Sequence, residues 1–376
     1  MARCDRHILI VTLLVLLVTG MGRAAPEEIK TLVIGASAPN FALPGVDGKI
    51  HRLADYAQAK VLVIIFTCNH CPTAQAYEGR IKKLVTDYKD QGVTIVAISP
   101  NDPLAVRLDE LGYTDVGDSF DDMKIRVKDK QWNLPYLYDG ENQKVSKAYG
   151  PMTTPHVFVF DAQRKLRFAG RIDNNERQPE KVTSHDTRDA IEALLQGEAV
   201  PVETTRTFGC SIKWASKRGS VAQAFEQWAA EPVSLEGIGL EGVGRLLKND
   251  TDKLRVINIW STGCGPCVVE FPELVTINRM YRRRDFEMIS ISVDGASRRA
   301  KVLDFLKEKQ ASFKNYLYTG DDIYAFIEAV DKDWPGAIPY TMLIKPGGEV
   351  LYQHLGLIDP LEVKQAIVEY LGRTYQ

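Results

Sequence analysis

Four cysteines, arranged as two pairs with two residues inside each pair, are the residues of this chain best suited to chemistry. They are Cys68, Cys71, Cys264 and Cys267. The first pair follows the apolar run Val61–Phe66, and the second follows Val256–Trp260. Far downstream of each pair, a proline precedes another strand-like segment, at Pro155 and at Pro339. The same arrangement therefore occurs twice.

Paired cysteines between a strand and a helix are suited to disulfide exchange. The reactive species is the thiolate, and a helix N-terminus or a CxxC setting lowers a cysteine pKa from roughly 8.5 to about 3.5–7.5. We expect the first cysteine of each pair to lie at a helix N-terminus, with its partner one turn inside. This predicts Cys68 and Cys264 as nucleophiles and Cys71 and Cys267 as resolving thiols.

A zinc half-site or a structural disulfide is the alternative interpretation of each pair. Structural zinc usually takes four ligands, often from two such pairs. Here the other pair lies in a repeat of the same pattern, where its own helix should hold it. The spacing therefore favours redox chemistry, and we expect no bound metal and no cofactor.

Residues near the pairs suggest supporting roles. A cationic His70 between the first two cysteines would favour the thiolate and make that pair the more oxidising one. The alternative for His70 is an exposed loop residue of little effect. The bonds Thr154-Pro155 and Ile338-Pro339 precede strands and are candidates for cis geometry, the alternative being ordinary trans prolines at strand starts.

Each half of the chain alternates apolar strand patterns with amphipathic helix patterns. The predicted strands include Val93–Ile98, Val157–Phe160, Leu166–Ala169, Met288–Val293, Tyr340–Ile344 and Val350–Gln353, and the predicted helices include Asp189–Leu195, Val221–Ala229, Ala300–Leu306 and Leu361–Leu371. This order predicts an α/β fold with a mixed sheet between helices, present twice in tandem. We expect domains at 30–200 and 221–376, joined by a connector at 201–220.

The N-terminus predicts export. Arg3 and Arg6 precede the apolar segment Ile8–Val18, and small residues end at Ala24, so residues 1–24 match a cleaved signal peptide. An uncleaved membrane anchor is the alternative. We expect a periplasmic location without stable membrane insertion once the signal is cleaved. The net charge of −2 gives no electrostatic reason to expect nucleic acid as a partner.

Cys210, in the predicted connector, leaves the mature chain with an odd number of cysteines. Such a residue calls for an explanation in an exported protein. It could be a buried free thiol, an intermolecular link or a relay between the domains.

Further residues link the chain to a known superfamily. In the first half these are Gly35, Ala38-Pro39, Phe41, Phe66-Thr67-Cys68-Asn69-His70-Cys71-Pro72, Ala148-Tyr149-Gly150 and Thr154-Pro155, and in the second half Asn258-Ile259-Trp260, Cys264-Gly265-Pro266-Cys267, Glu270, Pro272 and Ile338-Pro339. The first half resembles the redoxin/AhpC-TSA, peroxiredoxin-like branch of the thioredoxin superfamily. The second resembles the TlpA/ResA group of extracytoplasmic thioredoxins. The resemblance implies two tandem thioredoxin-like folds, with Glu270 as a supporting residue.

The first half departs from the peroxiredoxin pattern. If Cys71 is matched to the peroxidatic cysteine, Ile64 and Cys68 stand where that family has Pro and Thr or Ser. This favours a dithiol site over a peroxide pocket.

Three functions follow as expectations. The first is an exported thiol–disulfide oxidoreductase that exchanges electrons with protein thiols and an upstream reductant, with flow from Cys264/Cys267 to Cys68/Cys71 if the two sites communicate. The second is a thiol peroxidase in which hydroperoxide oxidises Cys71 and the second domain reduces it. The third is a copper metallochaperone that uses the first cysteine pair with His70 or His156.

Overall fold

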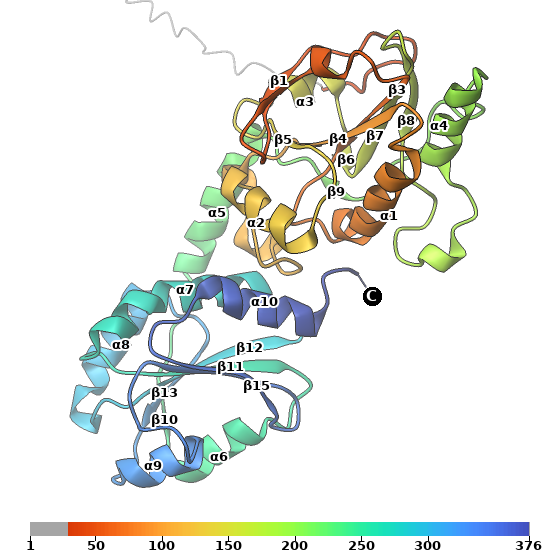
Figure 1. The fold of residues 1–376 in the computed structure, drawn as a ribbon. Coiled ribbons are helices and arrows are strands. Elements are labelled where there is room, and N and C mark those ends of the chain that lie inside the picture. The colour runs from red at the N-terminus through yellow and green to blue at the C-terminus, as the bar shows by residue number, and fades with distance from the viewer. Residues whose placement is uncertain (1–28, 376) are drawn as a thin grey trace, which may run out of the picture.

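The computed structural model describes residues 29–375, which form two units that each place a mixed β-sheet between helices (Figure 1). The predicted signal peptide and Cys4 lie outside the described residues. No helix among the described residues has the length and apolar character needed to cross a membrane. The predicted fold class, a mixed-sheet α/β architecture present twice, is confirmed.

The first unit is built on a five-stranded sheet in the order β5-β4-β3-β7-β8. The strands are β3 (Val61–Phe66), β4 (Val93–Ser99), β5 (Tyr136–Tyr138), β7 (His156–Phe160) and β8 (Leu166–Gly170). The first three are parallel, and β7 and β8 run antiparallel to their neighbours. The helices are α1 (Pro72–Tyr88), α2 (Phe120–Lys130), α3 (Lys144–Tyr149) and α4 (Asp186–Gln196). A small antiparallel hairpin pairs β1 (Ala42–Pro44) with β2 (Ile50–Arg52).

The central position of β3 in the sheet explains why its sequence is an unbroken apolar run. Successive side chains of a strand point to opposite faces of the sheet. Val61, Val63 and Ile65 pack into one buried cluster, while Leu62, Ile64 and Phe66 pack into another. Both faces of this central strand are therefore covered. The loop that carries Cys68 follows the strand and lies at one edge of the sheet.

The second unit repeats this plan with a six-stranded sheet in the order β10-β13-β12-β11-β14-β15. The strands are β10 (Glu236–Ile238), β11 (Leu254–Trp260), β12 (Phe286–Ser292), β13 (Lys314–Tyr318), β14 (Tyr340–Ile344) and β15 (Val350–Leu355). The helices are α5 (Arg218–Ala229), α6 (Leu240–Lys248), α7 (Gly265–Tyr281), α8 (Arg299–Glu308), α9 (Ile323–Val330) and α10 (Pro360–Leu371). Pro272 lies inside α7.

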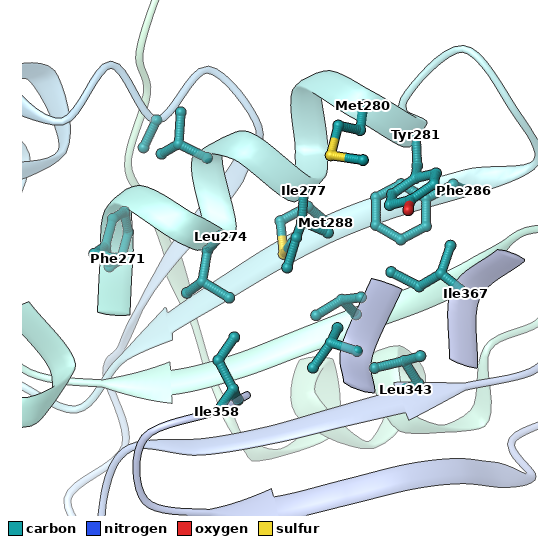
Figure 2. Packing of buried hydrophobic residues seen from close by; sticks show 14 of the residues in the cluster. Phe271, Leu274, Ile277, Met280, Tyr281, Phe286, Met288, Leu343, Ile358 and Ile367 are labelled. Atoms are coloured by element: carbon teal, nitrogen blue, oxygen red, sulfur yellow. The ribbon is translucent and has the colours of Figure 1, made fainter. Parts of the chain in front are cut away.

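Helix α7 provides much of the core of the second unit. Phe271, Leu274, Ile277 and Tyr281 are fully buried along its length and pack toward the sheet and α10 (Figure 2). The C-terminal end of α7 also meets the first unit, because Leu111 is part of the same buried cluster. This helix therefore reaches from the second cysteine pair to the boundary between the units.

The segment at 201–220, predicted as a connector, is largely packed onto the first unit. Strand β9 (Cys210–Ser211) pairs antiparallel with β6 (Thr153–Thr154), next to Pro155. The Lys213 carbonyl accepts a hydrogen bond from the Asp102 amide at 2.9 Å. Backbone pairing therefore ties the second half of this segment to loops of the first unit.

The two units meet through the loop that follows β4. The buried Tyr281 hydroxyl donates to the Thr114 carbonyl at 2.7 Å, and Arg284 donates to the Gly112 carbonyl at 2.8 Å. Near the C-terminus, Arg373 forms an ion pair with the buried Asp115 at 2.5 Å. The same loop continues to Asp118, beside the first cysteine pair, so the contact between the units and the first site share one segment.

Candidate redox sites

Cys71, not Cys68, caps the helix of the first site. Helix α1 begins at Pro72, with Cys71 in an extended conformation as its N-cap. Cys68 lies one turn earlier, in the loop after β3. The expectation that the first cysteine of each pair stands at a helix N-terminus is therefore wrong for this pair. The proline directly after Cys71 is the physical reason, since proline favours the first helical position and lacks an N–H for any earlier turn.

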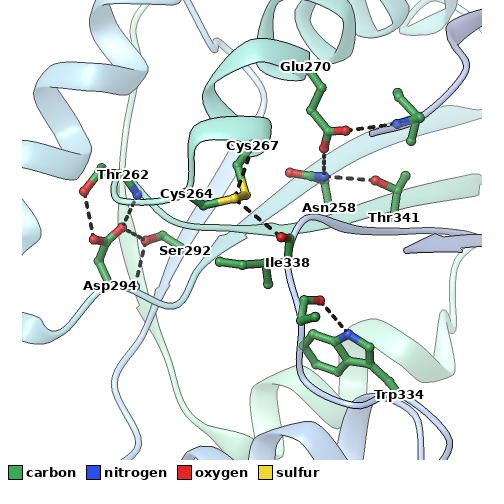
Figure 3. The surroundings of a disulfide bond; sticks show 12 residues. Asn258, Thr262, Cys264, Cys267, Glu270, Ser292, Asp294, Trp334, Ile338 and Thr341 are labelled. Carbon is green, nitrogen blue, oxygen red and sulfur yellow. Dashed lines mark hydrogen bonds between the residues drawn. A yellow bond between two sulfur atoms is a disulfide. The ribbon is translucent and has the colours of Figure 1, made fainter. Parts of the chain in front are cut away.

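In the second site, by contrast, the first cysteine does occupy the cap. Helix α7 begins at Gly265, Cys264 is its N-cap, and Cys267 lies one turn inside with no exposed surface. The Cys267 amide donates to Cys264 Sγ at 3.2 Å, and the two sulfurs form a disulfide (Figure 3). Cys264 stays partly exposed. The predicted placement is confirmed here.

The two late prolines show which cysteines correspond. Both Thr154-Pro155 and Ile338-Pro339 are cis, as predicted. Cys71 Sγ lies 3.2 Å from the Thr154 carbonyl oxygen, and Cys264 Sγ lies 3.5 Å from the Ile338 carbonyl oxygen (Figure 3). In each unit the cap cysteine contacts the carbonyl oxygen of the residue before the cis proline. The structural counterpart of Cys264 is therefore Cys71, and the two pairs are offset by one helical turn.

A third cysteine completes the first site. The Cys210 amide donates to Cys71 Sγ at 3.3 Å, and Cys68, Cys71 and Cys210 pack together in one small cluster. Cys68 Sγ also contacts the Thr154 hydroxyl at 3.1 Å. All three thiols are free. Nothing local in the sequence joins Cys210 to the pair, because the pairing of β9 with β6 brings it there.

His70 is held in a buried ion pair that the sequence did not reveal. Its Nδ1 lies 2.5 Å from Asp118 Oδ2, and both side chains are almost completely buried. Asp118 also accepts hydrogen bonds from the amides of Asn69 and His70 and from Asn101 Nδ2 at 2.7 Å. Burial opposes the cation, but the charge and hydrogen bond of Asp118 raise the pKa of His70 overall. The alternative of an exposed loop histidine is excluded.

The three thiols of the first site have very different acidities. Burial opposes ionisation of Cys71, yet hydrogen bonds with Cys210 and Cys68 and the charge of His70 lower its pKa well below the usual value. Burial, the hydrogen bond with Cys71 and the Asp118 charge raise the pKa of Cys68. The hydrogen bond with Cys71 and burial raise the pKa of Cys210. His70 therefore favours a thiolate, as expected, but at Cys71.

Glu270 lies on the buried side of α7, one turn beyond Cys267. Its carboxylate accepts from Asn258 Nδ2 at 2.8 Å and from the Ile358 amide at 3.2 Å (Figure 3). Burial raises the pKa of this carboxyl, and the two hydrogen bonds only partly offset that effect. Glu270 is thus a buried acid on the helix that carries the dithiol. Within the described part of the chain, its hydrogen bonds go to Asn258 and Ile358 rather than to Cys264 or Cys267.

A pocket of about 340 Å³ opens where the first site meets the second unit. Its first-unit lining includes His70, Cys210 and Lys213, and its second-unit lining includes Met280 and Arg284. Tyr375, near the C-terminus, lines it as well. Cys210 is the only sulfur of the first site that lines this pocket, since Cys68 and Cys71 are 3% and 0% exposed.

The two sites lie at opposite ends of α7. Cys264 caps its N-terminus, whereas Met280, which lines the pocket beside Cys210, lies in its last turn. A helix rises 1.5 Å per residue, so these ends are about 24 Å apart. Disulfide exchange needs direct contact between sulfurs. In this arrangement the two sites cannot exchange electrons directly, and the expected flow from Cys264/Cys267 to Cys68/Cys71 is not supported.

One group in the described chain has donors that could hold a metal ion: Cys68, His70 and Asp118, all buried. The set mixes a soft thiol with a hard carboxylate, and His70 Nδ1 is already occupied by Asp118. His156, the other histidine considered for copper, is a buried residue of β7 that accepts a hydrogen bond from the Met152 amide. It has the role of an ordinary strand residue.

Comparisons with known proteins agree with this architecture. A family model described as the AhpC/TSA family matches residues 34–169, and a model described as Redoxin matches residues 243–367. The thiol-disulfide oxidoreductase ResA of Geobacillus thermodenitrificans (strain NG80-2) is 25% identical over 171 residues, which are 44% of this chain and 88% of that protein. ResA of Bacillus subtilis (strain 168) is 30% identical over 95 residues, which are 25% of this chain and 49% of that protein.

Solved structures include two similar proteins without an assigned activity. The hypothetical protein SMc02350 from Sinorhizobium meliloti 1021 is 31% identical, covers 50% of this chain and 97% of its own, and has a TM-score of 0.44. An uncharacterized conserved protein from Geobacillus kaustophilus is 37% identical, covers 48% and 92%, and has a TM-score of 0.43. With both family models matched and the fold present twice, this chain belongs to the thioredoxin superfamily, as a protein of two redoxin-type domains.

Proposed function

We propose that this chain is an exported thiol–disulfide oxidoreductase with two separate redox sites. The observation that carries the proposal is the repeated geometry of a helix-capping cysteine against the carbonyl before a cis proline, at Cys71 with Thr154 and at Cys264 with Ile338. In both sites a second cysteine lies three residues away, so a mixed disulfide formed at the cap can be resolved within the chain. The names of the ResA relatives support the same chemistry.

The nucleophile of the first site is Cys71, and Cys68 is a resolving thiol. Cys71 combines the cap position with a lowered pKa, while the pKa of Cys68 is raised. This reverses the assignment made from the order of the cysteines in the sequence. In the second site Cys264 stays the nucleophile and Cys267 the resolving thiol, and Glu270 supports the site through its buried hydrogen bonds with Asn258 and Ile358. Pro155 and Pro339 shape the surface beside the two nucleophiles.

The two sites act on different partners or in different steps. Their separation along α7 argues against direct exchange inside one chain, so each site meets its own thiol or disulfide. The second site, with Cys264 partly exposed, is suited to protein thiols and disulfides. The first site is closed to large partners by the burial of Cys68 and Cys71. The signal pattern at 1–24 supports a periplasmic location, where an upstream reductant would be needed to restore the thiols.

Insulin reduction driven by dithiothreitol tests this function with full-length protein. We expect the Cys68→Ser/Cys71→Ser variant to keep nearly all of the insulin reduction, because the buried first pair is closed to a protein substrate. Because Cys264 is the more accessible nucleophile, the Cys264→Ser/Cys267→Ser variant should lose most of it, and the quadruple variant should lose all catalysis. A quadruple variant as active as the unchanged protein would refute the proposal.

Trapping tests the assignment of nucleophiles. The Cys267→Ser variant should retain partners as mixed disulfides on Cys264, identified by mass spectrometry. At the first site Cys210 also contacts Cys71, so the double variant Cys68→Ser/Cys210→Ser is the one that should retain a small partner on Cys71. Cys71→Ser is the matched control and should trap nothing at the first site. Adducts on Cys68 in the Cys71→Ser variant, with none on Cys71 in the Cys68→Ser/Cys210→Ser variant, would restore the opposite order.

A thiol peroxidase is the second candidate. The match of the first domain to the AhpC/TSA family and the lowered pKa of Cys71 at a helix cap both favour it. In this case hydroperoxide would oxidise Cys71, and an outside thiol would regenerate it. Equal rates of peroxide consumption by the Cys71→Ser variant and the unchanged protein would eliminate this candidate.

Copper binding is supported only by the Cys68, His70 and Asp118 group and the third thiol nearby. Reduced protein that retains no copper(I) after passage through a desalting column would end that alternative.

A further inference from the structure

Cys210 is held against the first site by two independent features. Thr154 and Cys210 are register partners in the β6–β9 pair, and the Cys210 amide donates to Cys71 Sγ at 3.3 Å. Gly209, directly before it, has a φ of +140°, and a Cβ there would overlap the Thr154 carbonyl oxygen. Only glycine permits this close approach without strain. The segment is therefore fitted to the site.

The three thiols of the first site differ in how much of their surface is exposed. Cys68 and Cys71 have almost no exposed surface, whereas Cys210 is partly exposed and lines the pocket between the units. A thiol that enters this pocket meets Cys210 before it can reach either member of the buried pair. Cys210 contacts Cys71 and also lines the pocket, so it connects the buried pair with the pocket.

We propose that Cys210 is a third redox-active thiol of the first site, which forms a disulfide with Cys71 and passes the exchange from the buried Cys68–Cys71 pair to a small thiol in the pocket. This inference rests on the proposed thiol–disulfide exchange at Cys71. It adds a residue and a substrate class that the paired cysteines alone do not indicate.

The exchange is balanced within the chain. Starting from a Cys68–Cys71 disulfide, Cys210 gives up its proton, and its thiolate attacks Cys71 Sγ. The bond between Cys68 and Cys71 breaks, a bond between Cys71 and Cys210 forms, and Cys68 leaves as a thiolate that takes up a proton. No outside oxidant or reductant is consumed, because one disulfide replaces another.

The small thiol then supplies the electrons. Its thiolate attacks Cys210 Sγ, a mixed disulfide forms on Cys210, and Cys71 leaves as a thiolate. A leaving thiol of lower pKa departs faster, so attack at Cys210 with Cys71 as leaving group is the favoured direction. A second small thiol attacks the bound one, releases Cys210 as a thiol after proton uptake, and departs as a small disulfide. Two electrons have entered the site.

The pocket argues for a small molecule. Its volume of about 340 Å³ is near the lower end for small-molecule sites. Its charges are largely paired within the protein, with Lys213 on Glu110 at 2.5 Å and Arg283 on Asp109 at 2.7 Å. Walls from both units limit the approach of a folded protein to Cys210. A low-molecular-weight thiol fits these constraints.

Disulfide mapping of the full-length chain tests the bond. Reduced protein is oxidised with glutathione disulfide, quenched in acid, alkylated and digested without reduction for mass spectrometry. We expect a Cys71–Cys210 linked peptide in the unchanged protein, and the same peptide as the dominant first-site product in the Cys68→Ser variant. Oxidation of Cys71 in that variant with Cys210 still free would overturn the proposal.

Reduction kinetics test the route. Glutathione is added to oxidised protein, and recovery of free Cys71 is followed by alkylation and mass spectrometry. In the Cys210→Ser variant free Cys71 should recover at about one tenth of the unchanged rate or below, because only buried sulfurs remain to be attacked. Ser211→Ala, a change in the same strand that leaves all thiols, is the matched control and should recover at the unchanged rate.

These outcomes separate the two proposals. If Cys210→Ser recovers as fast as the unchanged protein, and insulin reduction still depends on the paired cysteines, then the role of Cys210 is wrong and the proposed function stands. If no cysteine of the first site exchanges with glutathione in any variant, the proposed function of that site fails as well.

Discussion

Replacing Asp118 with asparagine should lower both the stability of the first unit and the reactivity of the Cys71 thiol. One Asp118 oxygen accepts from the amides of Asn69 and His70, and the other accepts from His70 Nδ1 and Asn101 Nδ2. An asparagine retains one oxygen for the two amides but turns an amino group toward two donors. His70 can then stay only as a neutral ring, so the variant loses the buried ion pair.

The expected loss of stability is large. Removal of one partner from a buried ion pair typically costs about 3–5 kcal/mol. The double variant His70→Asn/Asp118→Asn removes both charges, so the sum of the two single losses should exceed its own loss by about 1–3 kcal/mol. Because the His70 charge is among the causes that lower the pKa of Cys71, Cys71 should also react more slowly at neutral pH in all three variants.

Site-resolved alkylation measures both effects. Iodoacetamide labelling of the reduced protein at pH 7, read by mass spectrometry at Cys71, gives the native reactivity, and labelling across a urea series gives the stability of the first unit. Asp121→Asn is the matched control, since this exposed carboxylate contacts Lys124 and not His70. Unchanged reactivity of Cys71 in Asp118→Asn, beside an unchanged control, would refute the role of the ion pair.

Three further changes have defined outcomes. Gly209→Ala should displace β9 from Thr154 at a cost of roughly 1–3 kcal/mol in backbone strain, seen as faster alkylation of the thiol at the next position; equal rates would contradict the fitted contact. Burial lowers the pKa of His156 to about 4, so the folded protein binds its proton less tightly than the unfolded chain. The free energy of unfolding should therefore be highest above about pH 6.5 and should fall by roughly 3 kcal/mol toward pH 4. In the His156→Asn variant the urea midpoint should fall less steeply across that range. Tyr281→Phe leaves the Thr114 carbonyl without its donor and should cost about 1–3 kcal/mol at the boundary between the units, measured as an earlier urea transition, whereas an unchanged midpoint would show that water replaces the hydroxyl.

The sequence by itself determined the features that depend on near neighbours along the chain. The unbroken apolar run at Val61–Phe66 predicted a strand covered on both faces, and β3 has those bounds. The CxxC spacing and the late prolines predicted two redox sites, and both cap cysteines contact the residues before those prolines. These signals are local because strand alternation, helix caps and proline restrictions act over a few residues.

The tertiary structure alone decided how the first site is composed. Asp118 reaches His70 across 48 residues of sequence, and Cys210 reaches Cys71 across 139. No periodicity encodes such contacts, because they depend on the path of the loop after β4 and on the register of β6 with β9. The two sites that look equivalent in sequence therefore differ: one is a dithiol at a partly exposed helix cap, and the other is a buried cluster of three thiols beside an ion pair.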